Sequence, residues 1–158
     1  MATVFDKIVA GEVESYVVWQ DDRHLGFLTP FPNTPGFTIV IPKANIGDDV
    51  FELSEHDYDE LMRATRTVAI LLKKALSVPR VALIFEGTGI AHVHAKLIPL
   101  HGELAGQTDV WSPDTEFNEL YRGWIDSKEG PRMSSQRLRE IQAQIVKVQV
   151  DEVPDRHS

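Results

Sequence analysis

Two histidines and a lysine alternate with small apolar residues in the run His92-Val93-His94-Ala95-Lys96. Residues two apart in a strand lie about 6–7 Å apart on one face, so the sequence predicts that His92, His94 and Lys96 share a face. Two imidazoles and an ammonium are costly to bury, and we therefore expect this face to border a cleft. Such a row of nitrogen groups suits a chain of phosphates, because one histidine can attack phosphorus while its neighbours offset charge on the non-bridging oxygens.

Two glycines, Gly87 and Gly89, flank Thr88 just before this run. Glycine allows backbone N–H groups to approach an anion closely, which favours a phosphate contact here. Ordinary explanations stay open: the glycines are typical of a hairpin turn, and two alternating histidines are typical of a solvated strand. A His-x-His pair can also bind zinc. The chain has no cysteine and its four other histidines are scattered, so we predict no metal and no cofactor.

Composition limits the classes of function that remain. A net charge of −8 disfavours a nucleic-acid polymer as partner, because such binding needs a basic face, whereas a few local donors can still hold a small anion. The sequence shows no apolar stretch of about 18 residues and no signal peptide, and without cysteine we expect a cytoplasmic protein with no membrane partner. We predict a single domain over 1–150 and a polar, disordered tail over 151–158.

The elements that must position these residues follow from periodicity and capping signals. Thr3 and Ser54 are predicted to cap helices that end near Gly11 and Ser77. Strands are expected over 16–19, 24–28, 37–41, 81–85 and 91–100, a long irregular loop over 101–131 and a last helix over 134–148. The fold class predicted is α+β, an antiparallel β-sheet packed with two main helices.

The run from His92 to Pro99 resembles the signature of the histidine-triad (HIT) family, in which three histidines alternate with apolar residues and a proline often follows. Residues 4–12 resemble the opening helix of that family, 19–28 its first hairpin and 32–43 its next loop and strand. The resemblance therefore covers residues 4–100 in the family order. Each segment is weak alone, but this order is highly specific.

The resemblance implies an activity as well as the sheet, and commonly a homodimer. It implies a hydrolase or nucleotidyl transferase that acts on nucleotides bonded at the α-phosphate, such as nucleoside phosphoramidates or dinucleoside polyphosphates, and a branch that acts on diadenosine polyphosphates such as diadenosine tetraphosphate. His94 matches the nucleophile, which would form a nucleotidyl-histidine that water cleaves, and His92 would orient and charge-balance it. The nucleotide-binding residues implied are Phe5, Ile8, Phe27, Leu28 and Thr29, with Thr88 and Gly89 beside the phosphate.

The chain departs from the family pattern at several positions. Lys96 replaces the third histidine; it can supply positive charge, but near neutral pH it shuttles protons less well unless its pKa is lowered. Thr29 stands where an Asp or Asn usually binds the ribose, and a hydroxyl cannot give the bidentate acceptance of a carboxylate. Thr3, Asp6 and Asn45 occupy the positions of a zinc site found in many bacterial members, so we expect no structural zinc.

Two other functions remain open. Lys96, Thr29 and the short loop at Thr88 favour a nucleotide-binding module with little or no turnover. A partner surface built by the last helix with Trp111, Tyr121 and Trp124 would instead favour an interaction protein, although such aromatic residues more often close the core. His101 can reach the cleft rim or face solvent, and we favour solvent.

Overall fold

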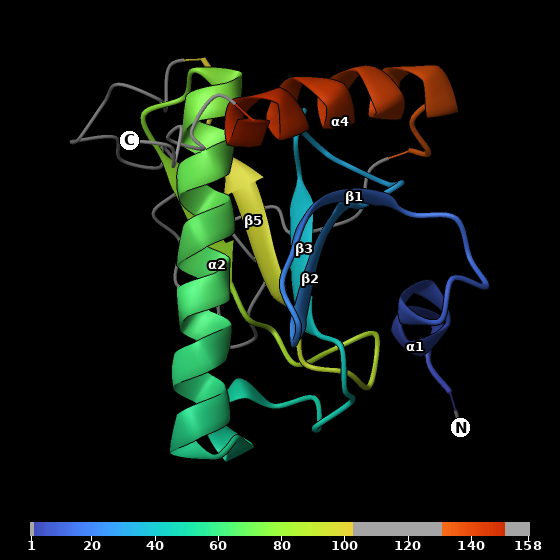
Figure 1. The fold of residues 1–158 in the computed structure, drawn as a ribbon, viewed down its shortest axis with the longest axis vertical. Helices are drawn as coiled ribbons and strands as arrows, with labels where there is room; N and C mark the ends of the chain where they lie inside the picture. The colour runs from blue at the N-terminus through green and yellow to red at the C-terminus, as the bar shows by residue number, and fades with distance from the viewer. Residues whose placement is uncertain (1, 103–130, 151–158) are drawn as a thin grey trace, which may run out of the picture.

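A computed structural model describes residues 2–102 and 131–150, and it places one antiparallel sheet at the centre of the molecule (Figure 1). The strand order is β1-β2-β3-β5-β4. The strands are β1 (Tyr16–Gln20), β2 (His24–Leu28), β3 (Thr38–Pro42), β4 (Val81–Ile84) and β5 (Ala95–Pro99). The helices are α1 (Val4–Val9), the 3-10 helix η1 (Val50–Glu52), α2 (Glu55–Leu76) and α4 (Ser135–Val150). The predicted α+β class is confirmed.

The two faces of the sheet are covered differently. The helices α2 and α4 pack on one face, where the main core includes Val40, Leu72 and Leu97. Alternating residues of the same strands, such as Phe27 and Ile39, form a smaller cluster with Phe5 of α1 on the other face. The second face therefore carries only the short helix α1 among the described helices, which leaves space there for a cavity.

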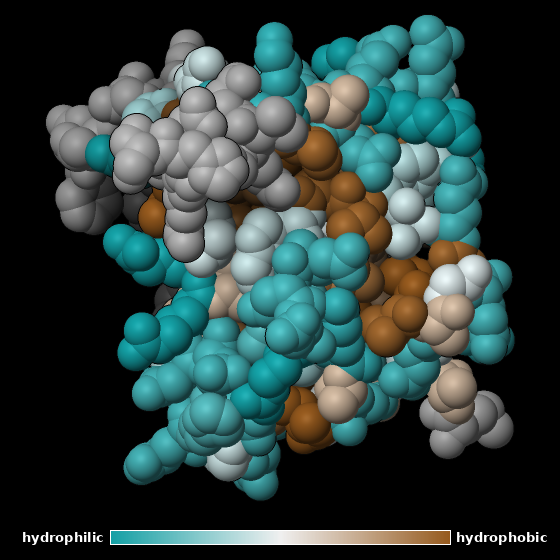
Figure 2. Space-filling view, in the orientation of Figure 1, coloured by the Kyte–Doolittle hydropathy of each residue, from teal (hydrophilic) through white to brown (hydrophobic). Residues whose placement is uncertain are grey.

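The C-terminal helix α4 contributes its apolar side to the main core. Leu138, Ile141 and Ile145 are each at most 2% exposed, so this side of α4 closes the core and is not available as a partner surface. Figure 2 shows that hydrophobic surface gathers instead between α1 and α4, over β1. Trp111, Tyr121 and Trp124 lie outside the described residues, as do most of the predicted loop over 101–131 and the tail 151–158.

Local signals set the ends of the first two main helices. The Thr3 hydroxyl accepts a hydrogen bond from the Asp6 backbone N–H at 3.2 Å, and Asp6 Oδ2 accepts from the Thr3 backbone N–H at 2.6 Å, which makes a two-way capping box at α1. At α2 the Asp57 backbone N–H donates to Ser54 Oγ at 3.1 Å, and the helix stops before Ser77, which has a left-handed backbone (φ 53°). Both caps and both ends were predicted.

The strand that ends at Pro99 is shorter than predicted. It was expected over 91–100, but β5 starts at Ala95, where its pairing with Val40 begins. Before that point, the Val93 backbone N–H donates to the Gly47 carbonyl at 2.6 Å, and the His92 N–H donates to the Ile90 carbonyl at 2.8 Å. These bonds bend the segment onto the loop after β3, so neither His92 nor His94 lies in the sheet ladder.

The part of the chain that the structure describes contains no helix long and apolar enough to cross a membrane.

Candidate active site

A cavity of about 460 Å³ opens on the α1 face of the sheet. Nine of the ten residues predicted for the site line it together: Phe5, Ile8, Phe27, Leu28, Thr29, Thr88, Gly89, His94 and Lys96. The structure thus joins α1, β2, the loop after β4 and the start of β5 around one space. The tenth residue, His92, does not line this cavity.

His94 is held with one ring nitrogen fixed. The side chain is 5% exposed, and its Nδ1 donates a hydrogen bond to the backbone carbonyl of His92 at 2.8 Å. Because a carbonyl can only accept, Nδ1 carries the proton and the Nε2 of the neutral ring carries a lone pair. Burial lowers the pKa of His94 below its ordinary value of 6.5; the His92 carbonyl and Glu86 oppose this shift, and the Lys96 ammonium and the neighbouring His92 ring add to it. His94 is therefore a neutral imidazole at pH 7, as a nucleophile requires.

His92 is fully buried and is not among the residues that line the cavity. Its Nε2 donates to the Pro42 carbonyl at 2.8 Å, and its Nδ1 lies 3.6 Å from Asp6 Oδ1 without a hydrogen-bond partner. The prediction that all three nitrogen groups border the cleft is therefore wrong for His92. The reason is the bend before β5, which turns this ring toward Pro42 and α1. His92 can orient His94 only through its backbone carbonyl and through packing.

Phe5 contacts both histidine rings edge-on. Its ring centroid lies 5.8 Å from that of His92 and 5.3 Å from that of His94, with interplanar angles of 76° and 73°. A third edge contact joins it to Phe27 at 5.6 Å. Phe5 belongs to the first turn of α1, so the capping box that starts this helix also fixes the aromatic wall of the site. The sequence predicted Phe5 only as part of the nucleotide pocket and missed this support.

Lys96 is paired with a carboxylate that the sequence did not indicate. Its Nζ lies 2.5 Å from Glu86 Oε2, and the two side chains are 15% and 28% exposed. Glu86 also lines the cavity. The signal that points to it is strand register: Ile84 is paired with Lys96, and Glu86 follows two residues later on the same side of the chain. That register cannot be read without knowing that β4 and β5 are neighbours.

The loop before the histidines needs glycine at two positions. Gly87 and Gly89 have left-handed backbones, with φ values of +65° and +87°. A Cβ on Gly89 would meet no atom within 4 Å, so its conformation and not crowding accounts for glycine there. Thr88 and Gly89 line the cavity in this conformation.

Thr29 is buried at the cavity wall with its hydroxyl partly engaged. Its Oγ1 accepts a hydrogen bond from the Phe31 backbone N–H at 3.2 Å, and it is 7% exposed. The hydroxyl hydrogen remains able to donate, so this position offers a bound molecule one donor in place of the two acceptor oxygens of a carboxylate. The structure adds wall residues that sequence reasoning missed: Val4, Val13, Glu14, Ser15, Tyr16, Pro30, Phe31, Ile39, Glu86 and Ile90.

A hydrogen-bonded cluster stands beside His92, at the positions compared with a zinc site. Thr3 and its hydroxyl donate to Asp6, and these bonds lower the pKa of Asp6, with His92 and Asn45 adding to the shift against the opposing effect of burial. Asn45 Nδ2 donates to the Ala91 carbonyl at 2.9 Å and its Oδ1 accepts from Gly47. Within 2–102 and 131–150, no group of three or more His, Cys, Asp or Glu side chains is placed to hold a metal ion.

His101 lies on the surface. It is exposed, and its Nε2 donates to the Pro35 carbonyl at 2.9 Å. This position agrees with the solvent-facing alternative, and His101 does not line the cavity that contains His94.

The sequence and the fold of this chain are similar to those of known proteins. A family model described as the HIT domain matches residues 10–103. An uncharacterised HIT-like protein of Saccharolobus solfataricus is 29% identical over 134 residues, covering 82% of this chain and 86% of that protein. An adenylylsulfatase of Arabidopsis thaliana is 31% identical over 61% of this chain and 69% of that protein. The crystal structure of a hypothetical histidine triad nucleotide-binding protein of Sulfolobus tokodaii has the same fold, with a TM-score of 0.70 at 21% identity, covering 98% and 99% of the two chains.

Proposed function

This chain belongs to the HIT domain family, and from its site we propose that it is a hydrolase or nucleotidyl transferase that cleaves nucleotides at the α-phosphate. The observation that carries this proposal is His94: a neutral, buried imidazole, with Nδ1 tied to a carbonyl and Nε2 left as the nucleophile, in the wall of a cavity. The cavity volume of about 460 Å³ lies within the range of small-molecule pockets. Nucleoside phosphoramidates and dinucleoside polyphosphates, including diadenosine tetraphosphate, are the candidate substrates.

The mechanism proposed has two displacements at phosphorus. The base and ribose lie against Phe27 and Ile8, and the α-phosphate lies beside Thr88. His94 Nε2 donates its lone pair to the α-phosphorus, the bond to the leaving group breaks, and the leaving group departs with that electron pair and takes up a proton. Water then attacks the nucleotidyl-histidine, loses a proton and returns His94 as a neutral imidazole. These steps call for no metal ion and no cofactor.

The test measures turnover and binding separately. The protein is incubated with a fluorogenic adenosine phosphoramidate and with diadenosine tetraphosphate, and AMP binding is measured by calorimetry. Release of AMP from at least one substrate is expected. If AMP binds but neither substrate is cleaved, the chain is the nucleotide-binding module with little or no turnover, which Lys96 and Thr29 would then explain.

The activity is expected to fall on the acid side of pH 6.5. The neutral form of His94 attacks, and its pKa is lowered from 6.5, chiefly by burial. Activity is therefore fully present above the ordinary histidine pKa and is lost as the pH falls through the lowered value. The measurement is the pH profile of kcat/KM, which reports the free enzyme. A loss that begins above pH 7 would show that His94 is not held in this neutral state.

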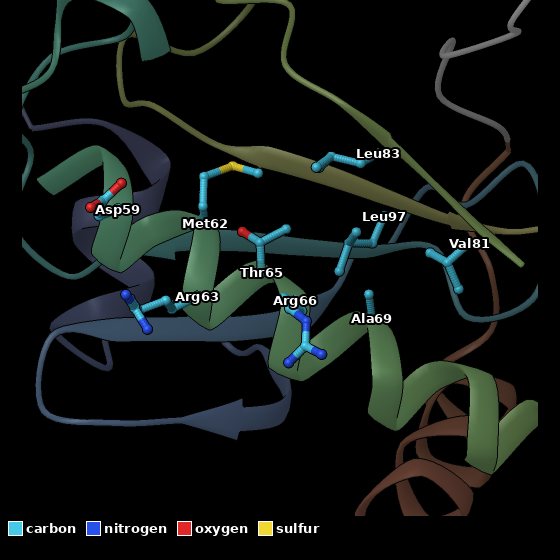
Figure 3. A pocket seen from close by; sticks show the side chains of 9 residues that line it. All are labelled: Asp59, Met62, Arg63, Thr65, Arg66, Ala69, Val81, Leu83 and Leu97. Carbon is cyan, nitrogen blue, oxygen red and sulfur yellow. The ribbon is translucent and has the colours of Figure 1, made fainter. Parts of the chain in front are cut away.

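The homodimer implied by the resemblance stays a prediction, and the β4 edge is the surface that suits a second copy. β4 is an outer strand of the described sheet, and Leu83 on it is 40% exposed. Beside it lies a groove of about 480 Å³ between α2 and the strands. Met62 and Thr65 line its α2 side, and they face Leu83 and Leu97 on the strands (Figure 3). Pairing of an edge strand with its copy is a common twofold contact.

Replacing Leu83 with lysine is expected to convert such a dimer to a monomer, because a charge would be placed in the apolar contact. The measurement is the molar mass by light scattering. The matched control is Ile70→Lys, since Ile70 is 37% exposed on α2 and does not line the groove. If the wild type is already a monomer, or if both variants behave alike, the dimer is absent or lies elsewhere.

The domain limit at residue 150 and the cytoplasmic location likewise stay predictions.

A further inference from the structure

The cavity around His94 has few charged side chains among its described lining residues, and these are paired with one another or with α4. Among the described residues that line it, Lys96 is the one residue of the lysine or arginine type. The carboxylates among them are Glu86 and Glu14. Lys96 is paired with Glu86 at 2.5 Å, and Glu14 is paired with Arg139 of α4 at 3.1 Å. Each of these charges therefore already has a counterion within the protein.

The Lys96–Glu86 pair is the one placed to decide what binds. Both side chains are mostly buried, at 15% and 28% exposure, so water and salt screen this pair less than a surface pair. The Glu14–Arg139 pair is more than 60% exposed on both sides and is screened. Both members of the first pair also act on His94: Lys96 lowers its pKa and Glu86 raises it. The electrostatic effect of both charges therefore reaches His94, beside which the α-phosphate lies in the proposed mechanism.

A site for several phosphates needs more positive than negative charge. Each phosphate beyond the first adds negative charge close to the Glu86 carboxylate, whereas the cation that should offset it is already held by that carboxylate. A substrate with one phosphate and an uncharged or cationic leaving group meets no such penalty. The described part of the cavity accordingly suits a phosphoramidate, whose leaving group is an amine, better than a polyphosphate chain.

We propose that Glu86 is a specificity-determining residue: by holding Lys96 in the cavity that contains His94, it selects nucleotides with a single phosphate, the phosphoramidate class, against nucleotides with a polyphosphate chain. This inference rests on the proposed function for its catalytic consequence. Its binding consequence stands on the charges alone. Glu86 acts through Lys96 and through the field in the cavity, and it takes no part in bond making.

The first test is a binding series with AMP, ADP and ATP, measured by calorimetry without turnover. For the wild type, affinity is expected to stay level or fall as phosphates are added. In Glu86→Gln the freed Lys96 is expected to raise the ATP-to-AMP affinity ratio by about tenfold, an effect that should shrink at high salt. Glu86→Asp keeps the charge and should stay near the wild-type ratio. Glu140→Gln on α4, which makes the same change in net charge outside the cavity, is the matched control.

The second test compares kcat/KM for the adenosine phosphoramidate and for diadenosine tetraphosphate. The ratio of the two is expected to fall by about tenfold in Glu86→Gln and to stay unchanged in Glu140→Gln. The inference is overturned if Glu86→Gln leaves the ATP-to-AMP affinity ratio within twofold of the wild type, or if Glu86→Asp shifts it as far as Glu86→Gln. If the affinity ratio shifts but neither the wild type nor any variant cleaves either substrate, the proposed function fails while the selection by charge stands. Thermal unfolding of each variant shows whether the fold is kept.

Discussion

Replacement of His94 by alanine is expected to lower kcat/KM for every substrate by about 10³-fold or more. No other described side chain in the cavity combines a neutral nitrogen lone pair with a fixed tautomer, so no neighbour can take over the attack on phosphorus. AMP affinity should change much less, because in the proposed complex the base and ribose lie against Phe27 and Ile8 and not against the imidazole. The measurement pairs steady-state kinetics with AMP calorimetry on the same preparation.

The control for this variant is His101→Ala. His101 is exposed and donates to the Pro35 carbonyl outside the cavity, so its loss should leave kcat/KM within about twofold of the wild type. A residual activity of His94→Ala above a tenth of the wild type would reject His94 as nucleophile. A substrate incubated with the wild type and quenched with base should also leave a nucleotidyl adduct on the peptide that contains residue 94, since phosphohistidine-type bonds resist alkali.

Replacement of Phe5 by alanine is expected to lower the free energy of unfolding by about 3–5 kcal/mol, the range for a buried phenylalanine. Phe5 is 6% exposed and makes edge contacts with Phe27, His92 and His94. Its loss should reduce catalysis as well, because both histidine rings lose the wall that holds them. The measurements are urea unfolding and kcat/KM at a temperature where the variant is still folded.

A matched control lies on the same chain. Phe51 is 88% exposed, and Phe51→Ala should change the free energy of unfolding by no more than about 0.5 kcal/mol. Phe5→Leu separates volume from aromatic contact: it should recover most of the stability and less of the activity. If Phe5→Ala is as stable as Phe51→Ala, then α1 does not hold the site in the way described.

Features written in neighbouring residues could be predicted from the sequence. The caps at Thr3 and Ser54 depend on side chains three residues apart, and both form as expected. The alternation around Ala95 also holds, since Ala95 and Leu97 are buried in the main core while Lys96 faces the cavity. The family order then supplied the residues of α1 and β2 that no local pattern could connect to the histidines.

Features that depend on distant partners were missed. The start of β5 was placed too early because the bend before it is fixed by the bond from Val93 to Gly47, 46 positions earlier in the chain. His92 was placed in the cleft for the same reason. Glu86 was overlooked because its pairing with Lys96 follows from strand register, and the supporting role of Phe5 follows from the way α1 folds back over the sheet.

The hydrogen bond that sets the tautomer of His94 has a main-chain acceptor. It is the carbonyl of His92, an atom of the main chain two residues away, whereas many histidine nucleophiles and bases depend on a carboxylate from elsewhere in the fold. A main-chain oxygen is present whatever side chain stands at its position. Point mutation can therefore weaken this orientation by shifting the segment, but it cannot delete the acceptor. The proton arrangement of His94 is thus robust to sequence drift in a way that a carboxylate-held histidine is not.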